Sequence, residues 1–103
     1  MANGIGRGTT PVNTFEVDVD LRNAEVVYLT YKQGNKTILE KTKEELTITE
    51  NEVSIRLTQE ETLAFKTTQN VEIQFRARFP DEDAIKSNII NTTAERILKE
   101  GVI

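Results

Sequence analysis

The segment VEIQFRARF, residues 71–79, alternates apolar and polar side chains without a break. A period of two places every second side chain on the same face of an extended strand, whereas a helix would spread these residues around its axis. One face therefore carries only apolar side chains, and the other carries glutamate, glutamine and two arginines. The segment predicts a strand with one buried face and one solvated face.

A second alternation follows Pro11, which suits the first residue of a strand because no ladder donor is missed there. The apolar set is Phe15, Val17, Val19 and Leu21, and the acidic set is Glu16, Asp18 and Asp20. Carboxylates could bind calcium or magnesium. Side chains on one strand face stand roughly 7 Å apart, which is too far for three to share one ion. We therefore interpret the acidic set as the solvated face of the first strand.

Two hairpins are predicted between these strands. The β-branched and aromatic runs 26–31 and 37–39 flank Gly34-Asn35, a pair that tolerates positive φ at both central positions of a tight turn. The second hairpin joins residues 46–48 to residues 53–57 through a turn at Glu50-Asn51.

The sequence contains few patterns that predict a helix, and each covers only a few residues. Thr58 and Glu61 match a capping box, which predicts one or two helical turns. Residues 84–93 resume a β-like pattern after a loop tip at residues 80–83. Residues 93–101 fit either a short helix stopped by Gly101 or a last strand.

Roughly seven short strands with turns between them predict an all-β fold, an immunoglobulin-like two-sheet β-sandwich with one short helical turn. A chain of 103 residues fits one domain. Residues 1–10 carry three glycines and two threonines, which favours a flexible N-terminal arm. Residues 11–103 are then the single β-sandwich domain.

Composition excludes several function classes. The chain has no cysteine and no histidine, which removes Ser-His and Cys-His catalysis and the usual zinc ligands. Its net charge is -4 and its basic residues are scattered, so nucleic acid is not an expected partner. The start has no apolar leader core, and no apolar run approaches the length of a membrane span. We expect a cytoplasmically made protein without catalytic residues, cofactor, metal or membrane partner, although lysine or carboxylate chemistry stays open.

Four residues of the predicted strands are candidate contacts with a partner protein. Tyr28 and Tyr31 fall on opposite strand faces, so at least one is available to an interface. Arg76 and Arg78 share a face and could grip a carboxylate of a partner. Charge pairing across strands of one sheet is the simpler account of the two arginines.

Four segments carry a family resemblance: GRGTTPVNTFEVDV, VSIRLTQEETLAF, VEIQFRARF and AERILKEGVI. In this order they resemble a group of small proteins encoded by phages and prophages of Gram-positive gut bacteria, over nearly the whole chain. The arginine-glycine-threonine lead-in and the LTQEE step are also similar, more loosely, to the N-terminal domain of phage baseplate upper proteins.

The resemblance implies a virion structural protein of a tailed phage, present in many copies at the tail, baseplate or neck. Such a protein would be made in the host cytoplasm, assembled into the virion and bound to other virion structural proteins, with no catalytic residues to carry over. Attachment would use strand edges, the N-terminal arm and the C-terminal residues. The contact residues implied in this way are Ile5, Arg7, Thr9, Thr10, Val102 and Ile103.

Two alternatives remain open. This chain lacks the long helical or receptor-facing parts of a full baseplate protein, so a head (capsid) decoration protein is one alternative. The other is a carbohydrate-binding or cation-dependent adhesion module that uses the acidic strand face and the few aromatic side chains.

Overall fold

The computed structural model describes residues 4–103, and most of its regular structure is β-strand. Five strands form the larger sheet: β3 (Val26–Gln33), β4 (Lys36–Thr42), β7 (Val71–Arg78), β8 (Ala84–Lys86) and β9 (Ile90–Thr92). Three strands form the smaller sheet: β2 (Val12–Glu16), β5 (Thr47–Ile48) and β6 (Glu52–Arg56). The remaining elements are β1 (Ile5–Gly6), the 3-10 helix η1 (Lys43–Glu45), α1 (Gln59–Leu63) and β10 (Ala94–Glu95).

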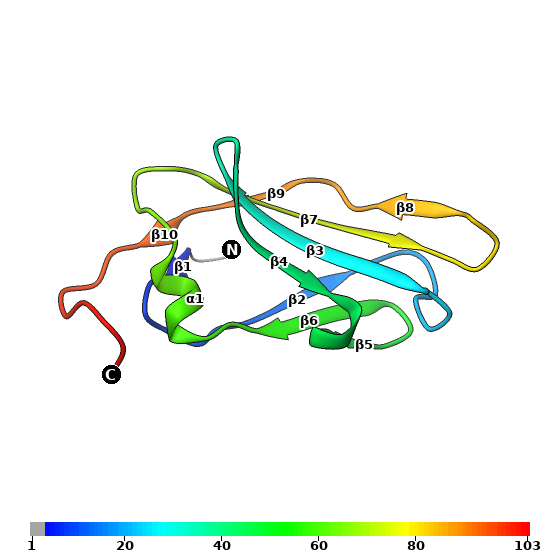
Figure 1. The fold of residues 1–103 in the computed structure, drawn as a ribbon, viewed down its shortest axis with the longest axis horizontal. Coiled ribbons are helices and arrows are strands. Elements are labelled where there is room, and N and C mark those ends of the chain that lie inside the picture. The colour runs from blue at the N-terminus through cyan, green and yellow to red at the C-terminus, as the bar shows by residue number, and fades with distance from the viewer. Residues whose placement is uncertain (1–3) are drawn as a thin grey trace.

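The two sheets form the layers of a sandwich (Figure 1). In the larger sheet the order is β4-β3-β7, and β8 and β9 pair one after the other with the far edge of β7. The order in the smaller sheet is β2-β6-β5. Strands β1 and β10 pair in parallel at the end of the sandwich where α1 lies. The predicted all-β two-sheet sandwich with one short helical turn is confirmed.

Both predicted hairpins are present. Strands β3 and β4 are joined by Gly34 and Asn35, with Gln33 and Lys36 directly opposite one another. Gly34 has a φ of 62°, and Asn35 does not have a positive φ. Positive φ at the first central residue alone is the pattern of a type II′ turn, whose twist matches that of paired strands. The second hairpin pairs β5 with β6.

The core lies between the sheets and is built from the alternating residues of the central strands. In β3 the buried hydrophobic residues are Val27, Leu29 and Tyr31, and they lie opposite Ala77, Phe75 and Ile73 of β7. Val53 of β6, Leu57 just after it and Phe65 after α1 are also buried. The remaining buried hydrophobic residues are Ile5, Leu21, Ala24, Val71 and Ala94. The predicted strand at residues 71–79 therefore has the buried and solvated faces that its alternation indicates.

Tyr31 gives a measurable signature of this core. Its ring is fully buried and tilts against Phe65 at a centroid distance of 5.9 Å. Burial and, to a smaller extent, the charge of Glu61 raise the pKa of Tyr31 to about 12, against the lowering effect of the hydrogen bond that Asn13 donates to the hydroxyl oxygen.

We expect a Tyr28→Phe variant, in which Tyr31 is the remaining tyrosine, to ionise with a midpoint near pH 12 when absorbance at 295 nm is followed. Because the unfolded chain ionises at about pH 10, the folded state should lose stability as pH rises through that interval. The same variant in denaturant is the control, and a midpoint near 10 for the folded protein would contradict the burial of Tyr31.

One side of the sandwich is closed by an ion pair and by η1. Lys41 of the edge strand β4 lies opposite Leu29 in register, and its ammonium group bonds the Glu61 carboxylate of α1. Glu61 also accepts from the backbone N–H of Thr58, while the Thr58 hydroxyl accepts from the Glu61 N–H. The predicted capping box is confirmed, and it orients the carboxylate that faces Lys41. An inward-pointing charge on an edge strand disfavours pairing with another chain.

The Lys41–Glu61 pair predicts a specific acid dependence. Burial raises the pKa of Glu61, but hydrogen bonds from Lys41 and from the Thr58 backbone outweigh it, so the net pKa is lowered. A group with a lowered folded pKa stabilises the fold above its unfolded pKa, and this contribution disappears as pH falls through the folded pKa. Glu61→Gln keeps the capping acceptor and removes the charge. We expect a loss of about 1 kcal/mol at pH 7 and no difference from wild type in strong acid, measured by urea unfolding.

The structure differs from the predicted flexible arm over residues 4–10, while residues 1–3 of that arm lie outside the described part of the chain. Ile5 is buried, and its N–H donates to the Thr93 carbonyl at 2.6 Å. The N–H of Arg7 donates to the Glu95 carbonyl at 3.1 Å. The physical reason is the parallel pairing of β1 with β10, which fixes this segment to the domain.

The last part of the chain contains only a minimal strand. Residues 94–95 form β10, and residues 96–103 contain no helix or strand. Of the two alternatives for residues 93–101, the strand holds over two residues and the helix does not form. Ile103 is held by Gln59, whose amide donates to the Ile103 carbonyl at 3.1 Å and accepts from the Ile103 N–H at 2.8 Å.

Candidate functional site

The side of the sandwich opposite η1 is a groove, which we call the open side. One wall is residues 11–19, which include β2, and the other is residues 85–88 and 90–92, which include parts of β8 and β9. Ile73 and Phe75 lie between the walls, and Gly4 and Ile5 also line the groove. Two consecutive depressions of about 340 and 370 Å³ make up its length. Both walls are edges of sheets, because β2 pairs only with β6 and β8 and β9 pair only with β7 within residues 4–103.

The open side exposes side chains that a closed sandwich would bury. Ile90 lies opposite the buried Ile73 in register, so it belongs to the inner face, yet it is 40% exposed. Phe15, Val17 and Ile85 are only partly buried for the same reason. An apolar groove between two unpaired backbone edges is the geometry that accepts an added strand, because main-chain groups supply hydrogen bonds and the groove takes alternate side chains.

The rim of the open side is acidic. Glu16 and Asp18 follow one wall, and Lys86 is the basic residue of the other. The adjoining depression of about 540 Å³ adds Asp81 and Asp83 at the end of the groove. Four carboxylates against one ammonium group favour a partner segment that carries positive charge.

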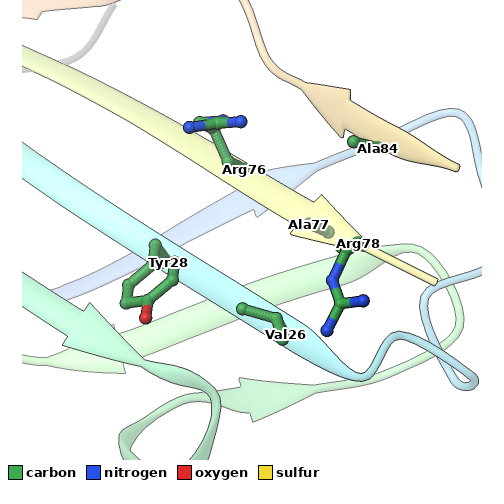
Figure 2. Close-up of a pocket in the computed structure, with 6 residues that line it drawn as sticks. All are labelled: Val26, Tyr28, Arg76, Ala77, Arg78 and Ala84. Carbon is green, nitrogen blue, oxygen red and sulfur yellow. The ribbon is translucent and has the colours of Figure 1, made fainter. Parts of the chain in front are cut away.

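A second, smaller surface lies on the outer face of the larger sheet. Here a depression of about 170 Å³ is lined by Val26, Tyr28, Arg76, Ala77, Arg78 and Ala84, shown in Figure 2. Tyr28 lies opposite Arg76 and Val26 lies opposite Arg78 in register. In Figure 2 the Arg76 side chain extends away from Tyr28, and the Arg78 guanidinium lies near Val26.

The two arginines of this surface have different electrostatic surroundings. Arg78 lies 3.7 Å from Glu25 and 3.8 Å from Glu82, so pairing within the chain accounts for its charge. Arg76 lies opposite Lys86 in register and forms no ion pair with any residue between 4 and 103. Of the two predicted explanations, charge pairing within the chain therefore fits Arg78, and a partner's carboxylate remains a prediction for Arg76.

One of the two tyrosines predicted as contact residues is exposed and the other is buried. Tyr28 is exposed on the outer face, while Tyr31 is buried in the core. The opposite faces followed from the odd spacing of the two residues, but Tyr31 is not available as a contact residue. Its position among the inner-face residues of β3 is the physical reason.

The predicted contact residues of the N-terminal segment are used within the chain. Ile5 is buried and Arg7 binds α1 and the C-terminal segment, so neither is a free contact residue. Thr9 donates to the Gly6 carbonyl at 2.6 Å, and Thr10 accepts from Arg56 at 3.3 Å. These two threonines are exposed. Val102 and Ile103 are also exposed, in agreement with the sequence expectation that they are accessible.

The predicted acidic set is solvated, but β2 ends at Glu16, so Asp18 and Asp20 lie after the strand and not on its face. Glu16, Asp18 and Asp20 are all exposed, and the three carboxylates do not converge. Asp20 bonds Arg22 instead, and hydrogen bonds from the Arg22 side chain and backbone lower the pKa of Asp20 to about 2. The described residues contain no group of three or more carboxylate, histidine or cysteine side chains placed to hold a metal ion.

Val19 and Ile90 are the site residues that sequence reasoning missed. The alternation assigned Val19 to the buried half of the first strand, but β2 ends at Glu16 and Val19 is 38% exposed. The doubled isoleucine at residues 89–90 interrupts the apolar-polar alternation. That interruption is the signal that could have marked the open side.

Three further observations concern the capacity to span a membrane, the exposed surfaces and the similarity to known proteins. No helix in the described residues is both long enough and apolar enough to cross a membrane. The outer-face depression and the open side are two surfaces on which predicted contact residues or inner-face apolar residues reach solvent. The exposed residues Thr9, Thr10, Val102 and Ile103 are not among the residues that line them. Comparison of the chain with protein-family models, with curated proteins and with solved structures gave no match.

Proposed function

We propose that the protein is a non-enzymatic structural subunit of a tailed-phage virion, at the tail, baseplate or neck, that binds neighbouring subunits through its sheet edges. The virion assignment rests on the sequence resemblance. The open side is the observation that supports the binding mode, because it places two unpaired strand edges beside exposed inner-face apolar residues.

The mode of attachment is a rigid groove in place of a mobile arm. Residues 4–10 are already paired and packed, so ordering them on a partner contributes nothing to assembly. A strand that enters the open side would satisfy the free edge of β2 or of β9 and cover Ile90. Such a contact is small, and many copies side by side would make it strong through multivalency.

A charge placed in the groove tests this mode in particles. We expect Ile90→Lys to fold as wild type does, because Ile90 is 40% exposed, and to be absent from purified particles of a strain that supplies only this variant. The matched control is Thr47→Lys, an exposed position on the far edge of the smaller sheet, which should be incorporated normally. Mass spectrometry of the particles gives the copy number of each variant.

Purified particles also distinguish the proposed position in the virion from head decoration, and the virion assignment from the binding mode. Gold labelling of particles distinguishes a tail, baseplate or neck position from head decoration. If wild-type protein is absent from purified particles, the virion assignment fails. If Ile90→Lys is incorporated as well as Thr47→Lys, the virion assignment survives and the open side is not the attachment surface.

A further inference from the structure

Resting on the proposed function, we propose that the open side is filled by residues 96–103 of a second copy of this chain. This segment, which we call the tail, would lie as an added strand between β2 and β9 of its neighbour. Each copy would then offer a groove to one neighbour and a tail to another.

The tail is the other apolar surface of the molecule. Leu98 is 88% exposed, Val102 58% and Ile103 87%. Most of the remaining exposed large apolar side chains, Val12, Val19, Ile89 and Ile90, lie along or next to the open side. Exposed apolar side chains are costly in water when they gather. One copy's tail in another copy's groove would cover both sets at once.

The length and the conformation of the tail fit the groove. The groove wall runs from Pro11 to Val19, nine residues, and an extended strand covers about 3.3 Å per residue. The eight residues of the tail are therefore long enough to span most of the wall. Gly101 bends the tail with a φ of 92°. A Cβ atom added at Gly101 would have no neighbouring atom within 4 Å, so the tail has room to straighten there.

Charge complementarity favours the same occupant. The groove rim carries Glu16 and Asp18, with Asp81 and Asp83 at its end. The tail supplies Arg96, Lys99 and Glu100, all exposed, so its side chains carry two positive charges and one negative charge. A basic apolar segment entering an acidic apolar groove gains both apolar burial and charge pairing.

The tail does not occupy the groove of its own copy. It leaves β10 and runs past α1, where Glu100 bonds Arg7 and Ile103 bonds Gln59. Figure 1 shows the C-terminal end of the chain beyond α1 at one end of the molecule, whereas β2 and β8, which line the groove, extend toward the other end. Release costs these partly or fully exposed contacts and the packing of the partly buried Ile97 beside Gly8. Head-to-tail contact of this kind is heterologous, and it builds rings or open filaments of many copies.

The absence of cysteine in the chain permits a clean crosslinking test. One variant carries Val102→Cys in the tail, and a second carries Ile90→Cys or Val19→Cys in the groove. The control partner carries Thr47→Cys on the far edge of the smaller sheet. Full-length variants are mixed in pairs and oxidised mildly, and mass spectrometry measures the disulfide-linked heterodimer. Because each chain has one cysteine, a heterodimer reports contact between copies.

We expect at least one groove variant to give heterodimer yields several-fold above the Thr47→Cys control. Adding Leu98→Ser and Ile103→Ser to the tail variant should return the yield to the control level, since both residues are largely exposed and contribute little to the fold. Groove yields equal to the control at both positions would overturn the inference. If Ile90→Cys then links to a different protein in purified particles, the proposed function stands and only the occupant is wrong.

Discussion

Replacing Arg7 with alanine is expected to lower the free energy of unfolding by about 2–3 kcal/mol. The Arg7 guanidinium donates to the Phe65 carbonyl at 2.9 Å, to the Leu63 carbonyl at 3.1 Å and to both oxygens of Glu100 at 2.9 and 2.7 Å. Its side chain is only 17% exposed. One residue thus ties β1 to the end of α1 and to the tail, and its loss leaves the two carbonyls without their donor.

Urea unfolding followed by circular dichroism measures this effect, and hydrogen exchange locates it. We expect the backbone amides at positions 5 and 7 to exchange faster in the variant, because β1 loses its main anchor. The matched control is Arg56→Ala, which removes one exposed contact of 3.3 Å to Thr10 and should change stability by less than about 0.5 kcal/mol. Equal effects of the two substitutions would mean that residues 4–10 are not fixed by Arg7.

Local sequence patterns are sufficient to predict the strand at residues 71–79, the first hairpin turn and the capping box. Residues 71–79, the Gly34-Asn35 turn and the Thr58–Glu61 capping box are patterns within a few residues of one another, and each is present in the structure. Alternation also placed Tyr28 and Tyr31 on opposite faces. Which of the two is buried depends on the side that the second sheet covers, and this is a long-range property.

The N-terminal segment shows why composition can mislead. Gly4 and Gly8 were interpreted as flexibility, but the structure uses them for close approach and for a turn. A side chain at Gly4 would place its Cβ 2.6 Å from the Thr93 carbonyl oxygen, and Gly8 has a φ of 74°. The partner strand β10 lies some ninety residues away in sequence, so no local pattern indicates this pairing.

The sequence predicts the type of candidate site, a strand edge, but not which strands form it. Attachment through strand edges stays a prediction. Which edges are unpaired follows from the sheet order, and residues of β2 and β9 line the same depression. The exposure of Ile90 depends on the absence of a strand beyond β9 in the described part of the chain. An apolar inner-face residue looks the same in sequence whether or not the sandwich is closed over it.

Replacing Gln33 with alanine is expected to destabilise the fold by about 2–4 kcal/mol. Gln33 is a buried polar residue whose amide nitrogen donates to the Lys66 carbonyl at 2.8 Å and to the Gln69 carbonyl at 3.1 Å. Its amide oxygen accepts from the Lys66 N–H at 2.9 Å. The side chain thus binds the loop between α1 and β7 to the end of β3, and alanine removes all three bonds and leaves a void.

Gln74→Ala is the matched control, because Gln74 is half-buried and makes one side-chain hydrogen bond, to the Ser87 carbonyl at 3.0 Å. It should cost about 1 kcal/mol. A second variant, Gln33→Glu, keeps the shape but places a carboxylate against the Lys66 and Gln69 carbonyls, so its pKa should be raised. Stability of Gln33→Glu should therefore increase, relative to wild type, as pH falls and the protonated group regains a donor. Equal losses for Gln33→Ala and Gln74→Ala would contradict the role of Gln33 in holding the loop.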